Sequence, residues 1–248
     1  MVKIDNWRIA IGVTLVVLSA VVYILHYLIF RDAHHIFIFL VEDIAFVFIE
    51  VLLVTMIIDQ LLHAREKQTL LFKLNMIIGL FFTEAGRELI ARLSTFYPDV
   101  EKIRSDLIMT DRWSREDFVN LEKRLETIDY RMDSQRGDLE GLRSFLGEKR
   151  DFLLRLLENP NLLEHEEFTD LLWGIVHLSE ELTFRKDLAA LPKTDHAHLS
   201  VDMRRAFTRI VRGWIRYMAH LKKDYPYLFH LAVRMNPFDP KAAPEVKE

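Results

Sequence analysis

The sequence contains no cysteine, and this single absence removes several classes of chemistry. Disulfides, thiolate metal sites and thiol nucleophiles are excluded, and a cysteine-free body fits a cytosol-facing location. Glycine and proline are also sparse, with 8 and 7 in 248 residues, so few positions interrupt long helices. Because no segment alternates polar and apolar residues as a strand does, the fold is predicted to be all-α.

The sequence also lacks a strong charge of either sign and any catalytic signature. Lys and Arg total 33 against 37 Asp and Glu, a net charge of −4, so nucleic acid is not expected as a partner. There is no Walker loop, dinucleotide fingerprint, nucleophile elbow, His-Glu-x-x-His motif or EF-hand spacing. We therefore expect no cofactor and no enzymatic activity.

Two long apolar runs, residues 9–30 and 36–62, fill the N-terminal quarter. Each exceeds the roughly 20 residues needed to cross about 30 Å of hydrocarbon, so residues 1–62 are predicted to form a two-helix transmembrane hairpin. The first run is longer than the apolar region of about 7 to 15 residues in a secretory signal, which favours a retained anchor. Basic residues flank both outer ends, whereas the connection carries only Arg31 and two histidines. The positive-inside rule therefore predicts an inner-membrane protein with both termini in the cytoplasm.

Carboxylates interrupt the second run, although an ionisable group at membrane depth costs at least about 2.5 kcal/mol. They are Glu42, Asp43, Glu50 and Asp59. An antiparallel hairpin that turns between His34 and His35 places His26 opposite Asp43 and Ser19 opposite Glu50. One interpretation is that these are internal polar pairs, which fix how the two helices align.

The other interpretation is functional and involves several copies of the chain. Asp43 and Glu50 lie on one stripe, about 10 Å apart along the helix, and neither apolar run contains Lys or Arg. A ring of chains would let both acids line a path for cations or protons, with the bilayer and other copies as partners. Glu42 lies about 100° around the helix and must face a different neighbour. Histidine changes charge near neutral pH, so His26 would tune the path.

The rest of the chain is predicted to form three parts. Residues 63–97 continue the second span as a helix or lie at the membrane surface, because the apolar positions from Leu70 to Phe82 recur at helical spacing. Residues 98–235 form a cytoplasmic helical bundle. The proline-containing tail, residues 236–248, is expected to be disordered.

Within the bundle, Ser114 and Asp117 form a capping box that starts a helix near Arg115. Leucines and other apolar residues from Leu121 to Leu156 alternate by four and three, which indicates a bundle or coiled-coil seam with Gln135 and Lys149 as polar interruptions. Both packing within the bundle and an intermolecular coiled coil remain open.

Proline positions divide the last part of the bundle. Asn159 and Pro160 predict a helix that runs to about Ala190. The last long helix is predicted to start near Ser200 and to break at Pro226, before residues 227–235. Asp195, His196 and His198 are then expected in a loop.

Two charged stripes are the remaining candidates for a site. The acidic stripe consists of Glu166, Asp170, His177 and Glu181, and the arginine stripe consists of Arg205, Arg209, Arg212 and Arg216. The acidic stripe is a weak metal candidate because a bundle site needs a second set of ligands from another helix, so a solvated face is favoured. Pairing between the stripes is the simplest expectation for the arginines. A site for lipid headgroups, a phosphorylated ligand or an acidic protein partner is the alternative.

These features favour a homo-oligomeric membrane protein with an acid-lined path for cations or protons, organised or gated by the cytoplasmic helical domain. The alternative is a membrane-anchored helical scaffold or sensor that recruits a cytoplasmic protein partner without transport.

Overall fold

The computed structural model describes residues 6–162 and 165–246, and these residues form helices and turns without a strand. The predicted all-α class is therefore confirmed. The chain divides into two compact units, residues 1–67 and residues 68–248, which we call the hairpin unit and the helical body. Helix α2, Ala33–Phe81, contributes its first part to the hairpin unit and its last part to the helical body.

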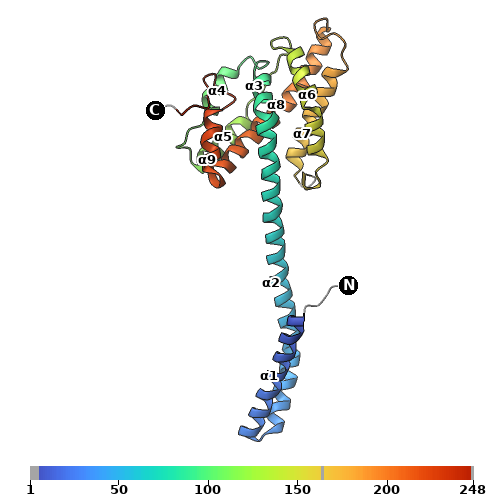
Figure 1. Ribbon diagram of the computed structural model, residues 1–248, viewed down its shortest axis with the longest axis vertical. Helices are drawn as coiled ribbons and strands as arrows, with labels where there is room; N and C mark the ends of the chain where they lie inside the picture. The colour runs from blue at the N-terminus through green and yellow to red at the C-terminus, as the bar shows by residue number, and fades with distance from the viewer. Residues whose placement is uncertain (1–5, 163–164, 247–248) are drawn as a thin grey trace. The chain divides into compact units, whose positions relative to one another are not determined.

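The hairpin unit consists of α1, Asn6–Phe30, and the first part of α2, and the chain reverses direction between them (Figure 1). Only Arg31 and Asp32 lie outside the helices here, so the connection is shorter than the predicted Arg31–His35 loop. Arg31 adopts a left-handed φ of 51°, and the Asp32 carboxylate accepts a hydrogen bond from the His35 backbone N–H at 3.1 Å. This cap starts α2 early enough to include both histidines.

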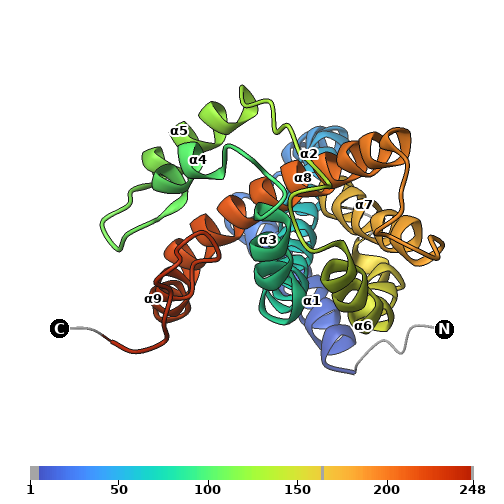
Figure 2. The ribbon, with the colours of Figure 1, turned by 90° about the horizontal axis from the view of Figure 1, so that it is seen from above.

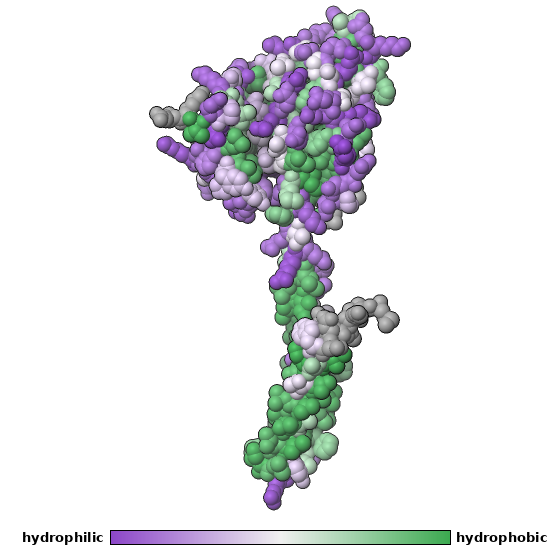
Figure 3. All heavy atoms as spheres, in the orientation of Figure 1, coloured by the Kyte–Doolittle hydropathy of each residue, from purple (hydrophilic) through white to green (hydrophobic). Residues whose placement is uncertain are grey.

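Apolar side chains cover the hairpin unit and are exposed (Figure 3). Among the described helices, length and composition single out Ile9–Phe30 as able to cross a membrane, with 22 residues and a mean hydropathy of 2.4. None of it is buried inside the protein, although an N-terminal signal sequence has the same properties. Residues 36–62 are helical as part of α2, but they are not identified as a membrane span by length and composition in the same way.

The helical body is organised around one long central helix, α8. Its helices are α3 (Arg87–Ser94), α4 (Val100–Leu107), α5 (Arg115–Glu126), α6 (Leu139–Leu157), α7 (Glu166–Thr183), α8 (Lys193–Asp224) and α9 (Pro226–Arg234). Helix α8 packs against α3, α5, α7 and α9, and Figure 2 shows it crossing the body between them. Phe207 and Trp214 of α8 are fully buried in the core that results.

A π-helical turn, η1 (Phe82–Gly86), follows α2 in the core. The Phe82 ring stacks on Tyr217 with 5.1 Å between centroids and meets Trp214 edge-on at 5.4 Å. Phe81 and Phe82 are fully buried. Gly86 has an ordinary helical backbone, but a Cβ there would lie 2.5 Å from the Phe82 ring, so only glycine fits without a shift.

The predicted seam from Leu121 to Leu156 is not one helix, because residues 127–138 form a loop between α5 and α6. Short polar side chains in this loop bond to nearby backbone: Asp133 accepts from the Gln135 N–H, and Asp138 caps α6 at Gly141. Gln135 is therefore a loop residue. The predicted capping box at the start of α5 is confirmed.

Two further helix boundaries differ from those predicted. Residues Pro160–Leu162 form a single 3₁₀ turn, and α7 begins only at Glu166 and ends at Thr183 rather than near Ala190. Helix α8 begins at Lys193, because the Pro192 carbonyl already accepts helical hydrogen bonds from the Asp195 and His196 N–H groups. The predicted break at Pro226 is present as the start of α9.

The segment from Asn236 differs from the predicted disordered tail over its described part, residues 236–246. Phe238 is buried in the core, and the buried Asn236 side chain donates to the Leu107 carbonyl at the end of α4, at 2.7 Å. An apolar anchor and a polar anchor therefore hold this segment against the body. The last two residues of the predicted tail lie outside the described residues.

Candidate functional site

The candidate residues of the hairpin unit do not form the internal polar pairs that one interpretation of the sequence gave. Asp43, Glu50 and Ser19 make no hydrogen bond or ion pair with each other or with His26 within the described hairpin unit. His26 Nδ1 is buried without a partner, and its ring contacts Phe30 at 4.8 Å between centroids. Glu42 also has no described partner. Among the four acids of the second apolar run, Asp59 alone has a described partner, His63 at 3.3 Å, whereas Glu42, Asp43 and Glu50 have none among the described residues.

The arginine stripe lies along α8 and is paired with acids from three helices. Arg205 bonds to Asp202 of its own helix at 3.0 Å, Arg209 faces Asp170 of α7 at 3.8 Å, and Arg212 faces Glu126 of α5 at 3.5 Å. Arg216 bonds to Glu122 of α5 at 2.6 Å and also to Glu167 of α7. Pairing between the two predicted stripes is thus limited to Arg209 and Asp170. Helix α5 supplies partners that the sequence did not indicate.

Three arginines of the stripe line a cavity of about 340 Å³. Arg209, Arg212 and Arg216 lie on one side with Thr208, and His165 and Tyr217 contribute further polar groups. The arginine side chains are 40–44% exposed, and each is already paired with at least one acid. Because Glu167 and Asp170 also line the cavity, an anionic ligand would compete with these acids for the arginines.

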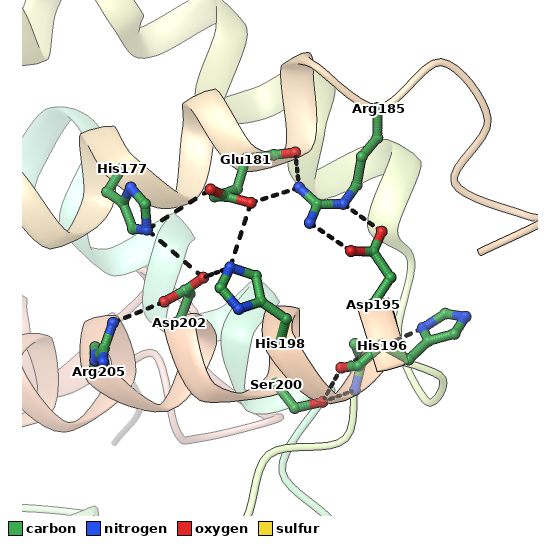
Figure 4. Close-up of polar contacts among 10 residues, drawn as sticks. His177, Glu181, Arg185, Asp195, His196, His198, Ser200, Asp202 and Arg205 are labelled. Carbon is green, nitrogen blue, oxygen red and sulfur yellow. Dashed lines mark hydrogen bonds and ion pairs between the residues drawn. The ribbon is translucent and has the colours of Figure 1, made fainter. Parts of the chain in front are cut away.

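The acidic stripe separates into two parts. Glu166 lies exposed in the first turn of α7, and Asp170 faces Arg209. His177 and Glu181 instead face His198 and Asp202 of α8, as Figure 4 shows. The facing histidine and carboxylate that the sequence did not indicate therefore lie in the first three turns of α8. Sequence reasoning placed His198 in a loop, and a helix start at Lys193 would have revealed its i, i+4 spacing to Asp202.

Arg185 fixes the end of α7 against the start of α8. Its guanidinium donates two hydrogen bonds to Asp195, at 2.7 and 2.8 Å, and one to Glu181 at 2.7 Å. These bonds hold the pKa of both carboxyl groups below their ordinary values, since they stabilise the ionised forms. Both acids are therefore anionic at neutral pH.

Comparisons with known proteins identify relatives along almost the whole chain. Residues 2–62 match a family described as "MJ1433, N-terminal helical domain", and residues 70–234 match one described as "Uncharacterized protein MJ1433, C-terminal helical domain". One relative, "Uncharacterized protein MJ1433" of Methanocaldococcus jannaschii, is 42% identical over 237 residues, which cover 96% of this chain and 95% of that protein. No solved structure matches the chain.

Proposed function

The chain belongs to the MJ1433 family, and we propose that it is a homo-oligomeric inner-membrane protein with an acid-lined path for cations or protons. The cytoplasmic helical body organises or gates that path. The observation that carries this function is the set of unpartnered carboxylates in the hairpin unit, Glu42, Asp43 and Glu50.

The hairpin is proposed to span the membrane because of its apolar surface. Residues 9–30 and 36–62 are helical, expose large apolar side chains and exceed the roughly 20 residues that a span needs. Basic residues beyond both outer ends support an orientation with both termini in the cytoplasm.

The unpartnered acids support an assembly of several copies. A carboxylate at membrane depth needs a partner or water, and neither run contains a Lys or Arg that could neutralise Asp43 or Glu50. Because the described hairpin offers them no donor, the polar surroundings must come from other chains and from water between them. Rings of Asp or Glu side chains are a known basis of cation selectivity in channels.

The test is ion flux into liposomes that contain the purified protein. Wild type should pass protons or monovalent cations, and Glu50→Gln should reduce that flux about tenfold or more, because it removes the charge of one acidic ring. Glu148→Gln is the matched control, since Glu148 is exposed on α6 of the helical body. Size-exclusion chromatography checks that both variants keep the wild-type oligomer. Absence of wild-type flux at every pH and voltage would reject a conducting path.

A second candidate, a membrane-anchored scaffold or sensor, is favoured by the arginine-lined cavity of the helical body. Here the hairpin is only an anchor, and Arg209 and Arg212 hold an acidic protein partner. A hydrogen bond to a charged group contributes about 1.5–3 kcal/mol, so losing two of them should weaken binding about a hundredfold or more.

Variants that remove the charge of an arginine distinguish the scaffold from the ion path. For the scaffold, Arg209→Gln with Arg212→Gln should abolish co-purification of a cytoplasmic protein after cross-linking, whereas Arg150→Gln on the exposed face of α6 should not. Flux should be unaffected by either change. Retention of the partner by the double variant would exclude the arginine stripe as its binding surface.

A further inference from the structure

Two histidines and two carboxylates from facing helices converge at one point of the helical body (Figure 4). His177 and Glu181 are four residues apart on α7, and His198 and Asp202 are four residues apart on α8. This spacing puts each pair on one face of its helix. Helices α7 and α8 pack against each other, so the two faces meet.

The distances within this cluster suit a small cation. Asp202 Oδ2 lies 3.2 Å from His198 Nε2 and 3.7 Å from His177 Nε2. Glu181 Oε2 lies 3.5 Å from His198 Nε2, and Glu181 Oε1 lies 3.9 Å from His177 Nε2. Four-coordinate Zn²⁺ has bonds of about 2.0–2.2 Å, which places neighbouring ligand atoms about 3.3–3.6 Å apart. Ligand atoms of Glu181, His198 and Asp202 all lie within 4.8 Å of one another, and the His177 ring would have to move toward them to complete a set of four.

The buried carboxylate of Asp202 points independently to a ligand. Its side chain is 1% exposed, and Oδ2 accepts no hydrogen bond from any residue in the described ranges. The other oxygen, Oδ1, accepts from Arg205 at 3.0 Å, so Oδ2 is left facing the two imidazoles. A buried carboxylate oxygen without a donor is costly, and a bound cation would satisfy it.

Neighbouring side chains hold two of these groups in place, as outer-shell partners do in metal sites. Arg185 donates to Glu181 Oε2 and leaves Oε1 directed toward His177. Arg185 is itself fixed by its two bonds to Asp195. The Glu181 carboxylate is therefore positioned before any ligand arrives.

We propose that His177, Glu181, His198 and Asp202 bind a divalent transition-metal ion and that Zn²⁺ fits this set. Two imidazole nitrogens with two carboxylate oxygens match the ligand preference of Zn²⁺ and related ions, whereas Mg²⁺ and Ca²⁺ prefer oxygen ligands alone. The ion joins α7 to α8 and links the end of one helix to the start of the next.

The experiment measures Zn²⁺ binding by the full-length protein in detergent after treatment with a chelator. Isothermal titration should give one Zn²⁺ per chain, and binding should raise the thermal unfolding midpoint. His177→Ala and His198→Ala should each weaken binding about tenfold or more. Both histidines are about half-exposed, 49% and 54%, so these variants are expected to fold.

His230→Ala is the matched control, because His230 also pairs with a carboxylate, Asp111 at 2.7 Å, but lies on α9 outside the cluster. It should bind Zn²⁺ as wild type does. Equal Zn²⁺ affinity in His177→Ala, His198→Ala and wild type would overturn the site and leave ordinary histidine–carboxylate pairs. Tighter binding of Mg²⁺ than of Zn²⁺ would overturn the proposed class of ion.

Discussion

Phe82→Ala is expected to lower the free energy of unfolding of the helical body by about 3–5 kcal/mol, the range for deleting a buried phenylalanine. The ring is fully buried, stacks on Tyr217 and meets Trp214 edge-on. Alanine would lose these contacts and leave a cavity at the centre of the core. Because the π-helical turn places the ring against α8, the main helix of the body would lose its packing there.

Urea unfolding of the full-length protein in detergent, followed by tryptophan fluorescence, measures this loss. Trp214 is buried in this core and contributes to the signal together with the three other tryptophans of the chain. Phe184→Ala is the matched control, since its ring is 81% exposed and its removal should change stability by less than about 0.5 kcal/mol. A loss of under about 1 kcal/mol for Phe82→Ala would show that its surroundings collapse into the space.

Gly86→Ala is expected to destabilise the body by about 1–3 kcal/mol, although alanine normally favours a helix over glycine. The Gly86 backbone is helical, with φ −63° and ψ −41°, so the backbone itself accepts alanine. The cost comes from the new Cβ, which would lie 2.5 Å from the Phe82 ring and 2.8 Å from the Phe81 ring. Both rings are fully buried, so they cannot turn out into solvent to make room.

The opposite result is expected at Gly147. A Cβ there would meet no heavy atom within 4 Å, and the residue lies exposed in α6. Gly147→Ala should therefore stabilise the body by up to about 1 kcal/mol, through helix propensity alone. The same urea titration compares the two variants. If both variants changed the free energy of unfolding in the same direction, the steric explanation at Gly86 would be contradicted.

Local signals in the sequence predicted the helical class and several helix ends, because these depend on neighbouring residues. The capping box at Ser114 and the break at Pro226 are examples. The prediction of one helical seam from Leu121 to Leu156 was wrong. The apolar spacing continues across residues 127–138, although the chain there is a loop. Apolar spacing reports burial, and buried loop residues such as Met132 fit the same pattern.

The candidate sites depended on which helices meet, and one sequence does not contain that information. The arginine stripe was identified from its spacing, but its partners Glu122 and Glu126 lie about ninety residues away on α5. His177 and Glu181 were recognised as weak metal candidates. Their counterpart His198 was missed because α8 starts at Lys193 and not near Ser200, and without His198 the sequence did not single out Asp202.

The hydrogen bond from Asn236 to the Leu107 carbonyl joins two residues that are synthesised many seconds apart. They are 129 positions apart, and at a synthesis rate of about 5–20 residues per second the carbonyl waits about 6–26 s for its donor. During that interval the core lacks Phe238, which is buried in the complete protein. Helices α3 to α8 must therefore remain soluble on a nascent chain whose core is incomplete until residue 238 has been added.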